Sequence, residues 1–260
     1  MIDLLNKIEQ TAFKAGKAIL EIYNSSNFGI EIKVDNSPLT KADLAAHNVI
    51  VTDLTKITPE IPILSEESAD IPYTTRCNWE KYWLVDPLDG TKEFIKKNGE
   101  FTVNIALIEH GQPILSVVYV PVQDIAYTAA KGYGAFKKTA GNRQQIYSHK
   151  PARNIPVVVG SRSHISADVK TYLNKLGEHT MTAMGSSLKF CLVAEGIADL
   201  YPRLGLTSEW DTAAAQCIVE QAGGRVVTLD NKALVYNSKD SLLNPYFMVY
   251  GDSSREWIDI

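Results

Sequence analysis

The 260-residue sequence contains no apolar run that approaches the roughly 18 residues of a transmembrane helix. It also lacks an unbroken apolar segment near its start, where residues 1–9 interleave charged and apolar side chains. A secretory signal peptide would need such a segment. We therefore expect a cytoplasmic protein, and peripheral contact with the inner face of a membrane stays open.

Cysteine is scarce, since the chain contains only Cys77, Cys191 and Cys217. Their number is odd, and no pair has the short spacing that is typical of metal ligands. We expect these cysteines to be small buried side chains in a protein of a reducing compartment.

The chain has no excess of basic residues, because 26 Lys and Arg stand against 30 Asp and Glu, for a net charge of −4. Binding to a nucleic-acid polymer depends on clustered cationic contacts to phosphates, so we do not expect this class of partner. A small phosphorylated molecule is still a candidate ligand if a bound metal supplies the positive charge. Hydrophobic residues make up 45% of the chain, which is enough for a sizeable core.

Hydrophobic periodicity predicts an α+β first half. Apolar residues recur at helical spacing over residues 3–23, and Thr40 suits the N-cap of a second helix that ends near Leu54. Short apolar segments predict strands, and the later ones form an antiparallel meander. The predicted strands are 28–34, 61–64, 82–86, 101–108, 114–120, 125–130 and 134–137.

After about residue 150, predicted strands and helices alternate, which is typical of an α/β arrangement. We therefore expect two halves that share one cleft, residues 1–150 and residues 151–260, with the boundary near Lys150 and Pro151. The predicted strands of the second half are 156–160, 180–184, 198–202 and 225–229, and its predicted helices are 165–176, 187–195 and 212–222.

The sharpest functional signal lies at residues 83–91, where an apolar strand is followed by the sequence Asp-Pro-Leu-Asp-Gly-Thr. Pro87 cannot extend the hydrogen-bonded ladder, so we expect the strand to end in a turn. This turn would bring Asp86 and Asp89 to one side and aim the Leu88 carbonyl between them. Carboxylates and a carbonyl are hard oxygen ligands that suit Mg²⁺.

Two small features complete this turn. Gly90 permits a tight backbone path, and we expect Thr91 to cap a short helix that starts at Lys92. The alternative for the whole segment is an ordinary Asx turn that precedes a helix.

Further carboxylates follow other strands or open helices. Glu66 and Glu67 come after an apolar strand, and Asp211 opens a predicted helix. Taken alone, the glutamates are typical of solvated surface charges, and Asp211 is typical of an N-cap. Together with Asp86 and Asp89 they would form a site for more than one metal ion, because grouped carboxylates repel one another unless cations neutralise them.

These segments resemble the inositol monophosphatase superfamily. The marks are Ser-Glu-Glu at 65–67, Asp-Pro-Leu-Asp-Gly-Thr at 86–91 and Trp-Asp-x-Ala-Ala at 210–214, in the order of the family. The resemblance is clearest from Lys33 to Gly224 and covers nearly the whole chain. It implies a layered α/β fold, an α-β-α-β-α sandwich, and a phosphatase that uses two or three Mg²⁺ ions.

The resemblance also implies the metal ligands. Glu66, Asp86 and the Leu88 carbonyl would hold one Mg²⁺. Asp86, Asp89 and Asp211 would hold a second one.

The sequence Thr-Lys-Ala-Asp at 40–43 resembles the family segment that supplies an acidic partner to the threonine of the signature. Asp43 would then bind Thr91 and help it to orient and deprotonate the attacking water. Together with Glu66, these two residues are the expected catalytic set. The alternative is that Asp43 only supports the first turn of its own helix.

Longer strings resemble the bisphosphate nucleotidase branch of the superfamily, whose substrate is adenosine 3',5'-bisphosphate. They include Thr-Lys-Glu-Phe at 91–94, Ser-Arg-Ser-His at 161–164 and Gly-Ser-Ser-Leu-Lys-Phe at 185–190. In this interpretation Arg162 and Lys189 contact the second phosphate. The expected substrate contacts are Glu66, Leu88, Asp89, Gly90, Thr91, Arg162, His164, Gly185, Ser186, Lys189 and Asp211.

Several alternatives stay open. Arg162 and His164 could be surface or capping residues, and Lys189 could be a surface lysine. The chain could be an inositol or sugar phosphatase of the same superfamily, or a metal-binding regulatory module without turnover. The superfamily resemblance implies inhibition by Li⁺, and it leaves the oligomeric state undecided.

Overall fold

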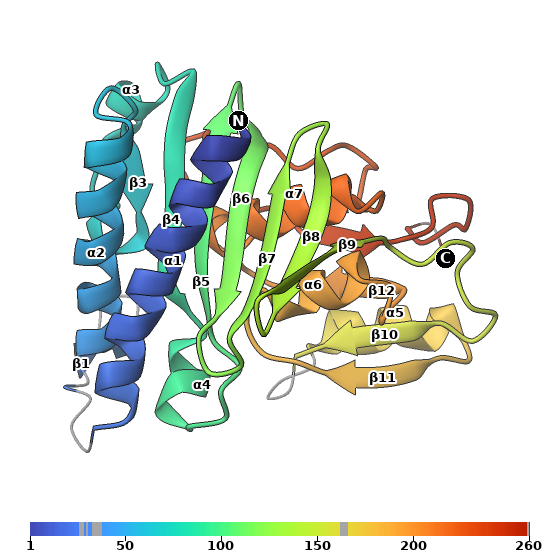
Figure 1. The fold of residues 1–260 in the computed structure, drawn as a ribbon. Helices are drawn as coiled ribbons and strands as arrows, with labels where there is room; N and C mark the ends of the chain where they lie inside the picture. Colours follow the sequence, from blue (N-terminus) through green and yellow to red (C-terminus); the bar gives the residue numbers. More distant parts are fainter. Residues whose placement is uncertain (26–28, 30, 33–37, 162–165, 259) are drawn as a thin grey trace.

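The computed structural model describes residues 1–25, 29, 31–32, 38–161, 166–258 and 260. Its two large sheets are separated by a layer of helices, and further helices cover their outer faces (Figure 1). The layers follow the order helix, sheet, helix, sheet, helix. The layered α/β sandwich expected from the sequence is therefore confirmed.

The larger sheet has seven strands, which lie side by side in chain order. β3 is parallel to β4, and every later pair is antiparallel, as expected for strands that hairpins connect. The strands are β3 (Ile63–Ser65), β4 (Lys81–Asp89), β5 (Thr102–Glu109), β6 (Gln112–Val120), β7 (Ile125–Ala130), β8 (Gly134–Thr139) and β9 (Asn142–Ile146).

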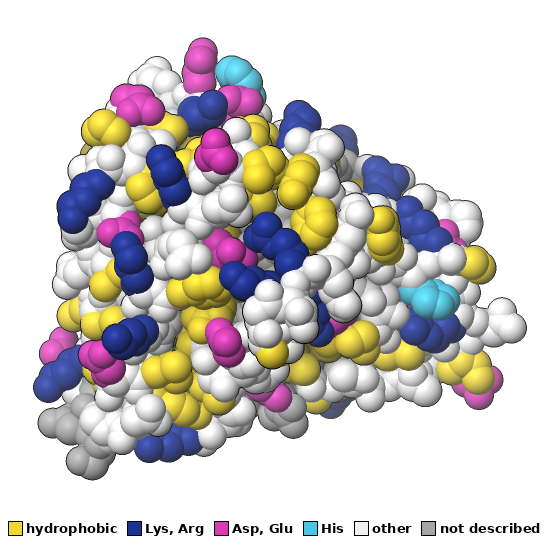
Figure 2. Space-filling view, in the orientation of Figure 1, with side chains coloured by type: hydrophobic (Ala, Val, Ile, Leu, Met, Phe, Trp, Pro, Cys, Tyr) yellow, Lys and Arg dark blue, Asp and Glu magenta, His cyan; other side chains and the backbone are white. Residues whose placement is uncertain are grey.

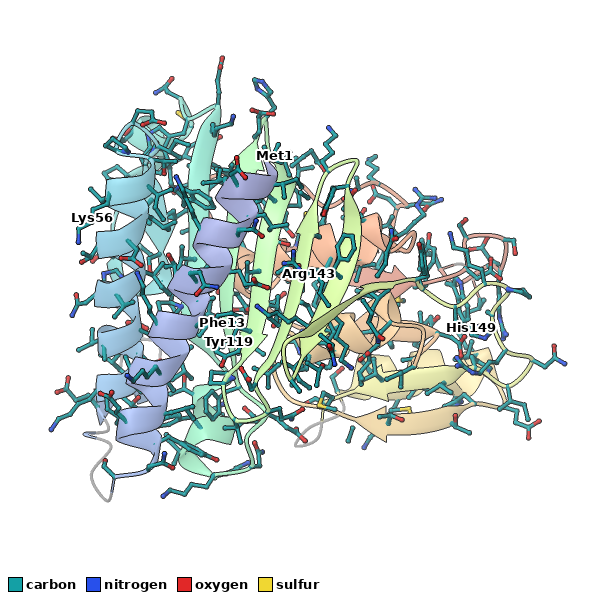
Figure 3. The ribbon with its side chains drawn as sticks, in the orientation of Figure 1. Met1, Phe13, Lys56, Tyr119, Arg143 and His149 are labelled. Carbon is teal, nitrogen blue, oxygen red and sulfur yellow. The ribbon has the colours of Figure 1, made fainter. Side chains whose placement is uncertain are left out.

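Helices α1 (Ile2–Tyr23) and α2 (Lys41–Ile57) pack against each other on one face of this sheet (Figure 1). α1 turns an apolar stripe inward, in which Leu5 and Ile8 are fully buried. Figure 3 shows Phe13 of α1 beside Tyr119 of β6, with ring centroids 4.8 Å apart. Each fully buried aliphatic or aromatic side chain contributes about 1.5–3 kcal/mol, so this stripe holds the helix on the sheet.

Helices α6 (Leu188–Ala194) and α7 (Ala213–Gln221) lie between the two sheets. All residues of α6 and residues 213–219 of α7 are buried. A helix that is buried on all sides needs layers on both of its faces. These helices therefore join the two sheets in one continuous core, and they place segments from both sheets around one site.

The smaller sheet has the order β11-β10-β12-β14-β13. Alternate residues of its strands face the central helices and an outer cluster that includes Tyr172 of α5 (Ala167–Leu176). The predicted division at residue 150 into two halves stays a prediction about folding units. The strands are β10 (Val157–Gly160), β11 (Thr180–Ala183), β12 (Leu200–Arg203), β13 (Arg225–Thr228) and β14 (Phe247–Tyr250).

The sequence missed three strands, β2, β9 and β14. β9 is mostly polar and exposed, so it carries little hydrophobic signal. The predicted strand 28–34 and the predicted helix start at 165 lie largely outside the described residues. Among the described residues of that region, β1 (Glu31–Ile32) pairs with β2 (Pro38–Leu39).

Two expectations from composition can be compared with the structure. Cys191 and Cys217 are buried as expected, but Cys77 is exposed, so the prediction of burial was wrong for that residue. Among the described residues, no helix combines the length and the apolar character needed to cross a membrane. On the face shown in Figure 2, basic side chains are interspersed with acidic and apolar ones.

Candidate metal and phosphate site

Asp86 and Asp89 lie at the end of β4, where the strand is irregular. β4 continues through Pro87 to Asp89. Asp86 pairs with Asn104 of β5 and Asp89 pairs with Thr102, so the register of the two strands shifts between the aspartates. The sequence had predicted that the strand ends at Asp86, which is wrong. The physical reason is a β-bulge, in which the missing N–H of proline costs no ladder hydrogen bond.

Asp211 comes from the side of the smaller sheet. It ends the 3₁₀-helix η2 (Glu209–Asp211), and its Oδ2 accepts a hydrogen bond from the Ser208 N–H at 2.9 Å. The N-cap position of α7 belongs to Thr212, so the alternative that Asp211 caps this helix is wrong. The capping box with Ser208 instead fixes the direction of the Asp211 carboxylate.

The three aspartates form a compact cluster. Ligand oxygens of Asp86, Asp89 and Asp211 all lie within 4.8 Å of one another. Burial, and then the nearby charge of Glu66, raise the pKa of Asp86 well above its usual value. Burial and the charge of Asp89 raise the pKa of Asp211 to about 8. A divalent cation would replace the protons and remove this repulsion, so the donor set fits Mg²⁺.

The raised pKa values predict that the metal-free protein loses stability as the pH rises. For Asp211, the stabilising contribution is fully present below the unfolded pKa of 3.8 and is lost as the pH rises through the folded pKa of about 8. We expect the metal-free melting temperature to fall between about pH 6 and pH 9. Mg²⁺ should raise it more at the higher pH.

Calorimetric melting in EDTA and in Mg²⁺ at both pH values tests this prediction. Asp211→Asn should flatten the pH dependence, because the titrating group is gone. A metal-free melting temperature that rises over this pH range would contradict the prediction.

Glu66 lies close to the cluster, because its charge raises the pKa of both Asp86 and Asp211. It begins the 3₁₀-helix η1 (Glu66–Ser68), directly after β3. The preceding Ser65 is fully buried, and its Oγ lies 2.9 Å from Nδ1 of His47 on α2. Sequence reasoning missed His47, although it stands one helical turn after Asp43.

Thr91 does not cap its helix. α4 (Thr91–Ile95) begins at Thr91 itself, the N-cap position is Gly90 at φ 96°, and no side chain caps this helix. The predicted cap is therefore wrong. The Thr91 hydroxyl instead donates to Asp43 Oδ1 at 3.4 Å, and it lies 3.5 Å from the Leu88 carbonyl oxygen.

Asp43 has two contacts that the sequence had treated as alternatives. Its Oδ2 accepts hydrogen bonds from the N–H and Oγ1 of Thr40, at 2.7 and 2.6 Å. The bond from the Thr40 N–H is one half of the capping box that begins α2, where Thr40 is the N-cap as expected. Its Oδ1 faces Thr91. One carboxylate thus supports the helix and reaches the threonine of the signature.

A cavity of about 220 Å³ opens beside the carboxylates. Its wall contains six of the expected substrate contacts, namely Asp89, Gly90, Gly185, Ser186, Lys189 and Asp211. A Cβ added at Gly90 would lie 3.2 Å from the Glu100 carbonyl oxygen, at a positive φ that L side chains rarely adopt. Glycine is therefore needed where the backbone passes this wall.

The start of α6 contributes a hydrogen bond to the carboxylate cluster. The Ser187 N–H donates to Asp89 Oδ2 at 2.5 Å. This bond stabilises the Asp89 carboxylate.

Lys189 is the cationic residue of α6 in the cavity wall. Only 8% of Lys189 is exposed, so the alternative of a surface lysine is wrong. Its Nζ donates to the Ser186 carbonyl at 2.6 Å and lies 5.6 Å from the ring centroid of Tyr201. Burial lowers the pKa of Lys189 to about 8, although Asp89 opposes this shift.

Arg203 is another cation in the same wall, and sequence reasoning missed it. Its Nη2 donates to the Leu206 carbonyl at 2.5 Å, while its buried Nε has no hydrogen-bond partner among the described residues. Arg203 lies close enough to Lys189 to lower its pKa. Two neighbouring cations with unused donors suit an anionic group. Arg162 and His164 lie outside the described residues, so their roles stay predictions.

The chain is similar to known proteins along nearly its whole length. Residues 3–254 match the inositol monophosphatase family. The chain is 54% identical to the 3'(2'),5'-bisphosphate nucleotidase CysQ of Escherichia coli K12, over 95% of this chain and 99% of that protein. The crystal structure of CysQ from Bacteroides thetaiotaomicron, at 42% identity, covers 98% of both chains with a TM-score of 0.85. An inositol monophosphatase from Anabaena, at 25% identity, covers 96% of this chain and 91% of its own with a TM-score of 0.76.

Proposed function

The chain belongs to the inositol monophosphatase family, and from this premise we propose that it removes the 3'-phosphate of adenosine 3',5'-bisphosphate to give AMP and phosphate. One observation carries the proposal. A cluster of three carboxylates borders a cavity whose wall holds three cations, Lys92, Lys189 and Arg203. Such a site can hold one phosphate beside the carboxylates and a second phosphate beside the cations.

We assign two Mg²⁺ positions to the carboxylates. Glu66, Asp86 and the Leu88 carbonyl would hold one ion, and Asp86, Asp89 and Asp211 would hold the other. Bound Mg²⁺ would supply positive charge to the phosphoryl group and lower the pKa of a water molecule. A third ion and inhibition by Li⁺, which resembles Mg²⁺ in size but has half its charge, belong to the same proposal.

Asp43 and Thr91 would prepare the attacking water. The carboxylate of Asp43 is held by Thr40, so its second oxygen has a fixed direction toward the Thr91 hydroxyl. When the Thr91 hydroxyl donates its hydrogen bond to Asp43, the lone pairs of the Thr91 oxygen point elsewhere and can accept a hydrogen bond from water. The 3.4 Å contact between Thr91 and Asp43 is long, and such contacts often tighten when substrate binds.

Thr91→Val tests this role. The variant should lose about 10²–10⁴-fold in kcat, because general acid–base assistance typically contributes that much. Its affinity for Mg²⁺ should stay unchanged, since the Thr91 side chain is not a proposed ligand. Thr91→Ser keeps the hydroxyl and serves as the matched control. Equal kcat values for Thr91→Val and Thr91→Ser would remove the threonine from the mechanism.

The second phosphate would occupy the part of the cavity bordered by Lys189 and Arg203. A phosphate dianion has several acceptor oxygens, and Arg203 has an unused buried Nε donor. A bound dianion would also favour the charged form of Lys189. An inositol monophosphate has no second phosphate to use these cations, so the cavity favours a bisphosphate over that rival substrate.

A panel of phosphate esters tests the proposed function. We expect Mg²⁺-dependent release of phosphate from adenosine 3',5'-bisphosphate at a higher kcat/KM than from inositol 1-phosphate or fructose 1,6-bisphosphate. Preference for one of the other esters would identify a different phosphatase of the family. Absence of turnover with every ester would favour the regulatory module.

The wider setting also remains part of the proposal. We propose a cytoplasmic enzyme that acts on a small bisphosphate and does not need a nucleic-acid polymer.

A further inference from the structure

Glu209 is a fully buried carboxylate that belongs neither to the aspartate cluster nor to the cavity wall. Its Oε2 accepts a hydrogen bond from the Asn237 N–H at 2.8 Å. Its Oε1 has no hydrogen-bond partner among the described residues, and the Nζ of Lys239 lies 3.7 Å away. A buried charge is costly unless nearby groups offset it, so this carboxylate depends on the segment that contains Asn237 and Lys239.

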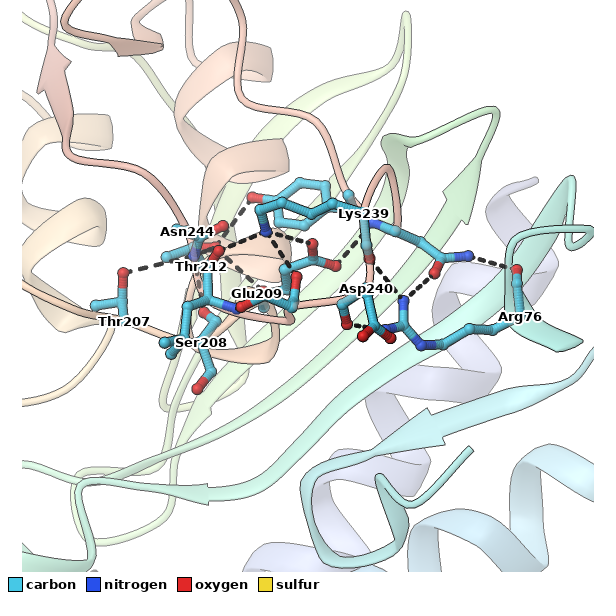
Figure 4. A network of polar contacts seen from close by, with 12 residues as sticks. Arg76, Thr207, Ser208, Glu209, Thr212, Lys239, Asp240 and Asn244 are labelled. Atoms are coloured by element: carbon cyan, nitrogen blue, oxygen red, sulfur yellow. Dashed lines mark hydrogen bonds and ion pairs between the residues drawn. The ribbon is translucent and has the colours of Figure 1, made fainter. Parts of the chain in front are cut away.

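That segment, residues 237–244, is called the support loop here. Figure 4 shows Arg76 at one end of its polar network and Glu209 near the middle. Arg76 is 2% exposed and donates from Nη1 to Asn237 Oδ1 at 2.5 Å. The Asn237 amide donates back to the Arg76 carbonyl at 2.6 Å. Arg76 also donates to the carbonyls of Lys239 and Asp240.

The other end of the support loop holds the start of η2. Asn244 donates from Nδ2 to the Ser208 carbonyl at 2.8 Å and to Thr212 Oγ1 at 3.0 Å. Ser208 is the residue whose N–H fixes the Asp211 carboxylate. Support-loop residues therefore contact Glu209 of η2 and the two residues that flank η2, Ser208 and Thr212. These contacts lie on both sides of Asp211.

A 3₁₀-helix of three residues has little stability of its own, so its position depends on such contacts. Mg²⁺ demands near-ideal octahedral geometry, so a small displacement of one ligand weakens binding. Arg76 ends α3 (Tyr73–Arg76), which follows η1 in the chain and thus the segment that begins with Glu66. The network therefore connects α3 with η2.

We propose that Arg76, Asn237 and Glu209 are positioning residues that fix η2 in place and so set the affinity of the carboxylate cluster for its metal. The inference rests on the proposed function only in taking Asp211 as a metal ligand. Within the network Asn237 is central, because its backbone binds Glu209 while its side chain binds Arg76.

Mg²⁺ binding to the metal-free full-length protein tests this proposal by titration calorimetry, without substrate. Glu209→Gln removes the buried charge and keeps the shape. Asn237→Gly keeps the backbone N–H and suits the positive φ of 53°, but it removes the link to Arg76. We expect each variant to bind Mg²⁺ about tenfold more weakly, as is typical when groups that orient metal ligands are lost.

Glu9→Gln is the matched control. Glu9 is also a buried carboxylate, 4% exposed, but it pairs with Arg143 at 3.0 Å and with Lys138 at 3.4 Å on the far edge of the larger sheet. Figure 3 labels Arg143 in this region. This control should lower the melting temperature and leave Mg²⁺ affinity unchanged. Glu209→Gln would give that same pattern if the role of Glu209 were merely structural.

The outcomes separate the two proposals. The positioning role is overturned if Asn237→Gly, and Glu209→Gln where it folds, bind Mg²⁺ with parental affinity while Asp211→Asn loses Mg²⁺ binding. Parental affinity in Asp211→Asn as well overturns the metal assignment and the positioning role with it. Should Glu209→Gln fail to fold, Asn237→Gly decides alone, because it leaves the Glu209 carboxylate and its backbone contact in place.

Discussion

Asp86→Asn is expected to abolish turnover and leave the protein folded. Asp86 is the ligand shared by both proposed Mg²⁺ positions, and asparagine keeps its shape while it removes the charge. We expect kcat/KM to fall by about a thousandfold or more, which corresponds to about 4 kcal/mol at about 1.4 kcal/mol for each factor of ten. Steady-state kinetics at saturating Mg²⁺ measures this effect.

The metal-free stability of the Asp86→Asn variant should not fall with its activity. The carboxylate of Asp86 is buried among Glu66, Asp89 and Asp211, which repel it in the absence of metal. We therefore expect the metal-free melting temperature to stay the same or to rise. The rise that Mg²⁺ causes in the parent should be lost.

Asp199→Asn is the control for a buried aspartate outside the site. Asp199 is 1% exposed and bound to Arg153 at 2.9 Å, so the loss of its carboxylate should destabilise the fold by about 1–3 kcal/mol. Mg²⁺-dependent activity should survive at temperatures where this variant is folded. Activity of Asp86→Asn within about tenfold of the parent would contradict the assignment of Asp86 as a metal ligand.

Much of the fold could be predicted because its signals are local. The apolar stripe of α1 and the strands of the meander need only side-chain periodicity, and the capping box at Thr40 needs only four neighbouring residues. β9 was missed because a polar strand at the sheet edge has no apolar face to reveal it. The bulge at Pro87 was missed because it depends on pairing with β5.

The same distinction applies to the site. Asp86 and Asp89 are three residues apart and end one apolar strand, so a sequence pattern can connect them. Arg203 meets Lys189 only because α6 packs against β12, and no local pattern marks that contact. Glu209 stands beside a recognisable motif, yet its partners lie in the distant segments of Arg76 and Asn237. Long-range packing determines these contacts, and sequence periodicity does not predict such packing.

Lys189→Met and Arg203→Met are expected to change substrate preference. Each variant removes one cation from the wall of the cavity that we assign to the second phosphate. A charge-assisted contact to a charged group contributes roughly 1.5–3 kcal/mol. Loss of either cation should therefore lower kcat/KM for adenosine 3',5'-bisphosphate about tenfold to a hundredfold.

The internal control is a monophosphate such as inositol 1-phosphate, whose hydrolysis uses the carboxylates but not the second phosphate position. Its kcat/KM should change little, so the ratio of the two kcat/KM values isolates the contribution of each cation. Lys14→Met, which removes a lysine from an exposed ion pair with Asp53 on α2, should leave the ratio as it is in the parent. An unchanged ratio in both Lys189→Met and Arg203→Met would take these residues out of phosphate recognition. The carboxylate site would then still support a metal-dependent phosphatase, but the choice of a bisphosphate would rest only on similarity to the nucleotidases.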